Sequence, residues 1–307
     1  MKKTFTLLLL LVTLGSYAQK SKLELNLQKD SVYNITADVK MDIDQLIQGT
    51  HQIIKSTITG VSAHKVLSVQ DTLYTFEVTY KSLAMNMALG DKTISFNSAD
   101  TDTTNMLSRV MHNMTGRSFI MVMSKRGKIV DVKNTENLFK DIFRGFPPID
   151  EQKKAQALVQ AQKSFNDKSI KGNFQESFVI FPKAPIGVKS TWSNQASIEA
   201  AAISIKTNTI FTLDNVTKDA YEISGLATIE PDKSPEFKSS SQFFMRLINV
   251  NGNTTVKATI NKKTGWIIKS EIIKHLKGDV ELKKTLSEPV MLTYPMVINI
   301  DVKSINN

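Results

Sequence analysis

The sequence contains no cysteine, few arginines and no apolar run long enough to span a membrane. Without cysteine there can be no disulfide, no lipid-modified cysteine, and no thiolate for catalysis or metal binding. A spanning helix needs about 20 consecutive apolar residues, whereas downstream runs such as Phe119–Met123 are short and lie near charged residues. We therefore expect no membrane span in the mature protein and a fold that is stabilised by its core.

Arginine, the side chain best suited to bidentate phosphate recognition, accounts for only five of the 39 basic residues. No motif combines basic with aromatic residues, so we do not expect nucleic acid as a partner. The net charge of +10 indicates instead a loose attraction to an anionic envelope surface, such as lipid headgroups or cell-wall polymers.

The amino-terminal end has the pattern of a cleaved signal peptide. Lys2 precedes a short apolar core at Phe5–Leu14, and the small residues Ser16 and Ala18 occupy the positions that a signal peptidase reads. The pattern predicts that residues 1–18 are removed and that the protein is periplasmic or secreted.

Alternation of apolar and polar residues is the dominant pattern in the rest of the chain. It is clearest in residues 33–44 and 74–89, and returns in residues 221–229, 256–260 and 296–302. A period of two indicates strands with one buried and one solvated face, which is typical of antiparallel sheets. Long strands of this kind twist, so we expect the sheet to curve.

Apolar residues at helical spacing predict three helices in the middle of the chain. The first extends from an amino cap at Asp102 to a stop at Gly116, the second covers Asn134–Arg144, and the third begins at Asp150. The third helix is expected to turn four residues inward: Ala155, Leu158, Val159 and Phe165.

These patterns predict an α+β fold that is mostly antiparallel β, with two β-rich lobes or half-barrels joined by a helical segment. After the signal peptide, the expected parts are an amino-terminal lobe at residues 19–133, a helical linker at residues 134–168 and a carboxyl-terminal lobe at residues 169–307.

Two hairpins with similar turns occur about half the mature chain apart. Their turns, Ser124–Gly127 and Asn261–Gly265, each end in a glycine that can adopt a positive φ. One explanation is duplication of a β-rich unit. The other is chance, because turn chemistry alone favours glycine after polar residues.

The sequence does not predict a metal site, a cofactor or a catalytic residue. Its four histidines lack metal-ligand spacing and are interpreted as surface or partly buried structural residues: His51, His64, His112 and His275. Asp100 and Asp102, near Asn97, could hold a calcium ion, although helix capping is the simpler explanation.

Three short segments match the pattern of penicillin-binding enzymes and β-lactamases. Ser62 precedes Lys65 by three residues, Ser95 precedes Asn97 by two, and Lys263–Gly265 reads Lys-Thr-Gly. That chemistry requires the first serine and lysine on one face of a helix, whereas residues 57–69 have the pattern of strand and loop. In a strand, residues three apart point to opposite sides, so a serine hydrolase is only a minor alternative.

Methionine is concentrated in one part of the chain, over a predicted strand, helix and strand. Flexible thioether side chains suit surfaces that accommodate varied apolar partners, but they also occur in ordinary cores. The candidate ligand-binding residues are Met85, Met87, Met106, Met111, Met114, Met121 and Met123.

The segment Phe181–Trp192 resembles an uncharacterised family of exported bacterial proteins. Members of that family carry a proline-led segment that ends in glycine, a polar residue, serine or threonine, and tryptophan; here Gly187 is displaced from its usual place. The resemblance extends over nearly all of the mature chain and implies no known activity. At the level of architecture, the expected fold is also similar to the lipoprotein-carrier half-barrels of the bacterial envelope.

Together these features favour an exported envelope protein that binds an apolar or lipid-like ligand without catalysis. The alternatives are a structural or protein-interaction module of the cell envelope and, less favoured, the serine hydrolase.

Overall fold

A computed structural model describes residues 20–100, 105–146, 148, 150–200, 203–231, 235–240 and 243–306. The predicted signal peptide and Asp102 lie outside the described residues.

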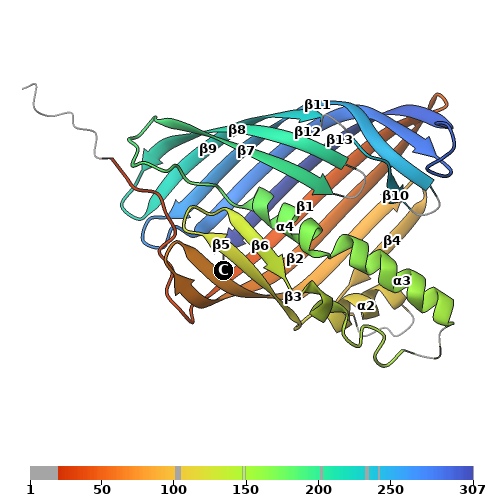
Figure 1. Ribbon diagram of the computed structural model, residues 1–307, viewed down its shortest axis with the longest axis horizontal. Helices are drawn as coiled ribbons and strands as arrows, with labels where there is room; N and C mark the ends of the chain where they lie inside the picture. Colours follow the sequence, from red (N-terminus) through yellow and green to blue (C-terminus); the bar gives the residue numbers. More distant parts are fainter. Residues whose placement is uncertain are drawn as a thin grey trace, which may run out of the picture.

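Antiparallel strands form one open sheet of thirteen strands, which confirms the mostly antiparallel β prediction (Figure 1). The main path of the sheet runs in the order β6-β5-β3-β2-β1-β13-β12-β11-β9-β8-β7, while β4 pairs with β3 and β10 with β11. The strands are β1 (Val32–Ile47), β2 (Thr50–Gln70), β3 (Leu73–Leu89), β4 (Lys92–Asn97), β5 (Ser118–Ser124), β6 (Ile129–Lys133), β7 (Thr191–Ala200), β8 (Ile203–Val216), β9 (Ala220–Pro231), β10 (Lys238–Ser240), β11 (Phe243–Asn261), β12 (Ile267–Lys283) and β13 (Leu292–Asn306).

Strand β1 joins the two halves of the chain at the middle of the sheet. It pairs with β2 on one side and with β13 on the other, so that Val39 lies opposite both Ile58 and Val302. The predicted division into two lobes is therefore not confirmed, because the hydrogen-bonded sheet continues from one half into the other.

Both halves follow the same path through the sheet. In each, three strands form a meander, a short strand leaves the main path, and a hairpin follows: β1 to β6 in the first half and β7 to β12 in the second. The glycines of the two hairpins have positive φ, 81° at Gly127 and 69° at Gly265, as the sequence predicted. This shared order of the main strands is what the duplication hypothesis predicts, although the second half adds β13 and its short strand β10 pairs with the following strand β11, whereas β4 pairs with the preceding strand β3.

The first predicted helix is shorter than expected. Helix α2 covers Met106–Met114, and Asn105 rather than Asp102 is its amino cap, since the Asn105 side chain accepts a hydrogen bond from the backbone N–H of Ser108 (3.1 Å). The predicted stop at Gly116 has a positive φ of 76°. The alternative prediction, a calcium site, includes Asp102 as a ligand. Because Asp102 lies outside the described residues, the structure does not describe this site.

The second predicted helix is wrong beyond its first turn. Only a 3₁₀ helix, η2 (Thr135–Phe139), forms there, and Asn134 before it is left-handed. The helical conformation is interrupted at Lys140, which is extended, and at Asp141, whose φ is 52°. Turns replace the rest of the expected helix.

The third predicted helix is present as α3 (Glu151–Ser164), with Asp150 as its amino cap. Its predicted inward face is wrong in part, because Ala155 and Val159 are exposed. A further helix, α4 (Asp167–Ser177), extends beyond the predicted linker and was not predicted. Its weak apolar periodicity explains the omission.

Helix α4 contacts both edge strands of the curved sheet, β6 and β7 (Figure 1). Gln175 accepts a hydrogen bond from Ile129 N–H (2.7 Å) at the β6 edge. After the helix, the carbonyl of Ile180 accepts hydrogen bonds from the side chains of Trp192 (2.8 Å) and Asn194 (2.7 Å) on β7. The helix therefore lies where the two edges of the open sheet approach each other.

An extended amino-terminal segment, residues 20–30, crosses one end of the interior. Its Leu25 N–H donates to the carbonyl of Lys125 in one hairpin turn (2.7 Å), and Asn26 N–H donates to the carbonyl of Thr264 in the other (2.8 Å). Three leucines of this segment are buried in the core: Leu23, Leu25 and Leu27. The segment thus links the two similar hairpins and covers that end.

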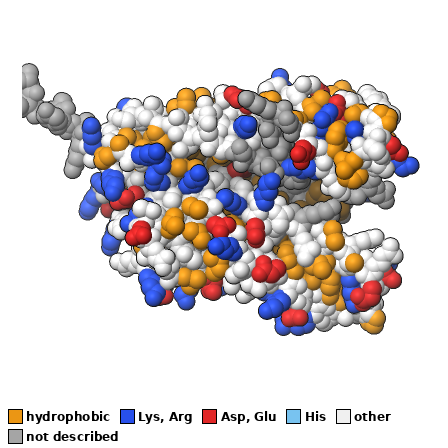
Figure 2. Space-filling view, viewed as in Figure 1, with side chains coloured by type: hydrophobic (Ala, Val, Ile, Leu, Met, Phe, Trp, Pro, Cys, Tyr) orange, Lys and Arg blue, Asp and Glu red, His pale blue; other side chains and the backbone are white. Residues whose placement is uncertain are grey.

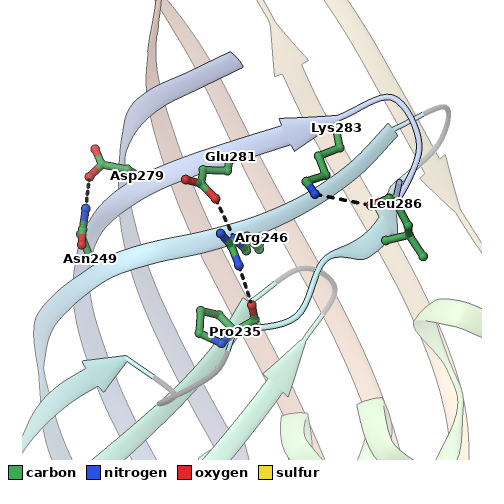
Figure 3. Close-up of polar contacts among 7 residues, drawn as sticks. All are labelled: Pro235, Arg246, Asn249, Asp279, Glu281, Lys283 and Leu286. Atoms are coloured by element: carbon green, nitrogen blue, oxygen red, sulfur yellow. Dashed lines mark hydrogen bonds and ion pairs between the residues drawn. The ribbon is translucent and has the colours of Figure 1, made fainter. Parts of the chain in front are cut away.

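Polar contacts join β11 and β12 near the other end of the sheet (Figure 3). Arg246 donates to the Glu281 carboxylate (2.7 Å) and to the carbonyl of Pro235 (3.5 Å), and Asn249 donates to the Asp279 carboxylate (2.8 Å). Because Pro235 precedes β10, the Arg246 contacts also hold that short segment against β11.

Candidate functional site

The concave side of the sheet contains a cavity of about 360 Å³ beneath helix α4. Figure 2 shows that the face of the molecule in view is hollowed. Branched and small apolar side chains of β1, β2, β12 and β13 form most of the wall: Ala37, Val39, Ile58, Gly60, Ile272, Ile300 and Val302. The remaining lining residues come from β12, β3 and α4: Lys274, Tyr80, Asn173, Phe174, Glu176 and Ser177.

The cavity lies where two clusters of apolar side chains meet. Tyr80 and Phe174 pack against the cluster that includes the amino-terminal leucines, and Ile300 packs against the second cluster, on β8, β9 and β11 to β13. Small residues on the sheet, Ala37 and Gly60, face polar helix residues such as Asn173 across the cavity. Short side chains on both sides leave the space between them unfilled.

An ion pair between the sheet and the helix borders this cavity. The Lys274 ammonium on β12 lies 2.6 Å from a carboxylate oxygen of Glu176 on α4. The two partners differ in exposure, since the Lys274 side chain is 10% exposed and that of Glu176 is 32% exposed. A lysine is almost never this deeply buried without a partner, so Lys274 is a paired positive charge among the apolar side chains that the sheet contributes to the wall.

A second, smaller cavity of about 100 Å³ shares Lys274, Glu176 and Ile272 with the first. Hydroxyl and amide side chains are frequent in its wall: Gln175, Asn194, Thr207, Thr209 and Thr254. Among them, the Thr254 hydroxyl is buried and has no hydrogen-bond partner among the described residues. Thr254 on β11 is also the cross-strand neighbour of Lys274.

A buried aromatic cluster lies beside the larger cavity. The ring of His64 is fully buried and packs against the rings of Phe174 (5.5 Å between centroids) and Trp266 (5.6 Å). Burial lowers the pKa of His64 to about 3, because charging the ring would require removing an ion from water. Burial likewise raises the pKa of the Tyr80 hydroxyl, so both groups are neutral near pH 7.

The serine of the predicted serine-lysine pattern is part of this cluster. Ser62 and His64 share a hydrogen bond of 2.9 Å between the serine oxygen and Nε2, a contact that no sequence pattern predicted. Ser62 is buried whereas Lys65 on the same strand is exposed, as the strand geometry predicted. The Lys-Thr-Gly segment lies in the turn between β11 and β12, with Lys263 exposed.

The other three histidines lie away from the cavity linings. His51 contacts Asp44 (2.8 Å), His275 contacts Asn299 (2.7 Å), and His112 contacts a backbone carbonyl in the loop after β4. Among the described residues, histidine and carboxylate side chains form no group of three that could hold a metal ion.

The candidate methionines are divided between core and surface. Met111, Met114, Met121 and Met123 are buried in the first apolar cluster, and Met106 is 38% exposed. The remaining two lie half-buried on β3: Met85 and Met87. None of the seven lines either of the two cavities.

Lys274 and Glu176 were not singled out from the sequence, although one signal was present. In β12, Ile272, Lys274 and Leu276 share one face, so a lysine occupies a position of the apolar alternation. A lysine in the buried phase of a strand indicates either an edge or a paired interior charge. Glu176 gave no comparable signal, because the helix that carries it was not predicted.

No helix among the described residues is both long enough and apolar enough to cross a bilayer. A search of curated proteins finds no match to the sequence. Among solved structures, this chain is similar to a lipovitellin studied for its lipid–protein interactions, with 10% identity and a TM-score of 0.48. The match covers 92% of this chain but only 25% of the lipovitellin chain.

Two further solved structures give lower scores. The outer membrane channel from Pseudomonas putida F1 has 5% identity and a TM-score of 0.28, with 94% of this chain and 99% of that one covered. OpdQ from Pseudomonas aeruginosa has 6% identity and a TM-score of 0.22, with 90% and 99% covered.

The comparison with protein families gives a match over most of the chain. The model of a family of unknown function, DUF6263, matches residues 71–267, which include β3 to β11 and the proline-led segment Phe181–Trp192. The predicted membership of an uncharacterised family is thereby confirmed: the chain belongs to the family of unknown function DUF6263.

Proposed function

We propose that this protein is an exported protein of the cell envelope that binds an apolar or amphipathic ligand, without catalysis, on the concave side of its sheet. The observation that supports this proposal is the apolar cavity of about 360 Å³ beneath α4. Its volume is within the range of about 300 to 1,000 Å³ that is typical of small-molecule sites. The basic exterior would favour anionic surfaces of the envelope as a place of action.

The composition of the wall favours binding over catalysis. Most of the side chains that line the larger cavity are apolar, and the ionised groups among them, Lys274 and Glu176, are paired with each other. Ser62 and His64 are buried in an aromatic cluster and the histidine is neutral. This arrangement offers an apolar chain a place to lie and a limited set of polar contacts to orient it.

Filling the cavity is expected to prevent binding. Ala37→Trp places an indole ring in the cavity from β1, and we expect the affinity for N-phenyl-1-naphthylamine, an uncharged apolar probe, to fall at least about tenfold because the probe and the indole compete for one volume. The measurement is a fluorescence titration of the purified protein.

Ala84→Trp is the matched control. On β3, Leu83 and Met85 pair with the lining residues Gly60 and Ile58 and share their face of the sheet, so Ala84 between them faces the other side. This variant should bind the probe as the wild type does. A wild-type protein that binds no apolar probe, and from which native mass spectrometry of envelope-purified material recovers no lipid, would instead favour the interaction module.

Export is tested separately by the mass of the protein recovered from cells. We expect the exported protein to begin at Gln19, because cleavage follows Ala18. Ala18→Arg places a bulky charged residue where the peptidase requires a small one, and the full-length precursor should accumulate. Recovery of the uncleaved wild-type chain from the cytoplasm would contradict the export proposal.

A further inference from the structure

We infer that the ligand is an amphipathic anion, whose acidic group pairs with Lys274 while its apolar chain occupies the larger cavity. This inference rests on the proposed function and specifies the chemical class of the ligand. Lys274 borders both cavities, so a molecule bound there would have its charged end at their junction, next to the hydroxyl and amide side chains that contribute to the wall of the smaller cavity.

The difference in exposure between the two partners of the ion pair makes exchange feasible. Lys274 is buried and belongs to the middle of a sheet, whereas Glu176 is one-third exposed and belongs to the last turns of α4. A ligand anion that takes the place of Glu176 keeps the buried ammonium paired, and the displaced carboxylate has access to water. Leaving the ammonium unpaired would be the costly alternative.

A second polar group is directed to the same place. Thr254 lies opposite Lys274 on the neighbouring strand, and its buried hydroxyl has no partner among the described residues. A buried hydroxyl without a hydrogen bond is unfavourable, and an anion held by Lys274 could accept one from it. Lysine and hydroxyl together resemble the small set of convergent polar groups that orient a ligand in an apolar site.

The test compares two probes with the same carbon chain, lauric acid and lauryl alcohol. At neutral pH the wild type should bind the acid at least about tenfold more tightly than the alcohol, because only the acid can pair with the buried ammonium. In Lys274→Met the affinity for the acid should fall by about that factor, while the affinity for the alcohol stays within about threefold. Isothermal titration calorimetry measures all four constants.

Lys277→Met is the matched control, since Lys277 lies on the same strand but is exposed, and its preference for the acid should remain. Glu176→Gln provides an independent variant in which the helix no longer offers a competing carboxylate. It should bind the acid several-fold more tightly than the wild type does, and its affinity for the alcohol should be unchanged. This second variant decides the question even if Lys274→Met does not fold.

The outcomes separate the inference from the proposed function. If acid and alcohol bind the wild type equally, and neither variant changes their ratio, the cavity binds apolar chains but Lys274 does not select an anion. If neither probe binds the wild type, the binding function itself is wrong and the inference fails with it. If instead the wild type prefers the acid, and this preference is lost only in Lys274→Met and increased in Glu176→Gln, the result supports both the proposed binding function and the inference that the ligand is an anion.

Discussion

Replacing Gly265 with alanine is expected to lower the free energy of unfolding by about 3 kcal/mol or more. Gly265 has a φ of 69°, which costs a side-chain-bearing residue about 1 to 2 kcal/mol. In addition, the new Cβ would overlap the backbone of Glu24 and approach the Cα of Leu25 to 2.9 Å. The amino-terminal segment would have to move away from the turn, and its buried leucines would lose part of their packing.

Gly90→Ala separates the two contributions. Gly90 also has a positive φ, 55°, but a Cβ there would meet no atom within 4 Å. The free energy of unfolding of Gly90→Ala should therefore fall by only about 1 kcal/mol, because backbone strain is its only cost. Urea unfolding followed by far-ultraviolet circular dichroism measures both variants. Equal losses would mean that residues 20–30 are not packed against the second hairpin as described.

Acid is expected to destabilise the protein through His64. The pKa of His64 is about 3 in the folded protein, whereas an unfolded histidine titrates near 6.5. Since the folded pKa is depressed, the neutral ring stabilises the fold fully above pH 6.5, and this contribution is lost as the pH falls from 6.5 toward 3. Between pH 7 and pH 5, linkage predicts a loss of about 2 kcal/mol in the free energy of unfolding.

His64→Leu removes the titrating ring and keeps an apolar side chain in the aromatic cluster. Its free energy of unfolding should be lower than that of the wild type at pH 7, because Ser62 loses its partner, but should change less between pH 7 and pH 5. His275→Gln is the control, as His275 is exposed and should leave the wild-type pH dependence intact. Parallel pH profiles for wild type and His64→Leu would contradict burial of a neutral histidine.

Gly265 and His64 belong to neighbouring parts of one interior. Trp266, which follows Gly265, packs against Tyr33 (4.9 Å between ring centroids) as well as against His64 (5.6 Å). The hairpin turn, the amino-terminal segment and the aromatic cluster therefore close the same end of the sheet. This packed end contrasts with the region beneath α4, where small and polar side chains leave the cavity open.

The candidate site shows where sequence reasoning was limited. Methionine content suggested a flexible apolar lining, but four of the seven residues fill the core instead. Thioether side chains suit both environments, and composition does not distinguish them. The cavity is lined instead by residues such as Ala37, Val302 and Lys274, which come from strands far apart in the sequence and meet only through the pairing of β1 with β13 and of β12 with β13.

The sequence by itself determined the class of structure: its period-two alternation predicted the long antiparallel strands, its glycines predicted the two hairpin turns, and the absence of cysteine excluded disulfides. These properties follow from local backbone geometry and from which face of a strand is apolar. Only the tertiary structure decided that the two halves form one sheet, that α4 lies between its edges, and that Lys274 meets Glu176, which is distant in sequence. The reason is that strand pairing and cavity volume depend on how distant segments fit together, and no local pattern encodes the space that remains between them.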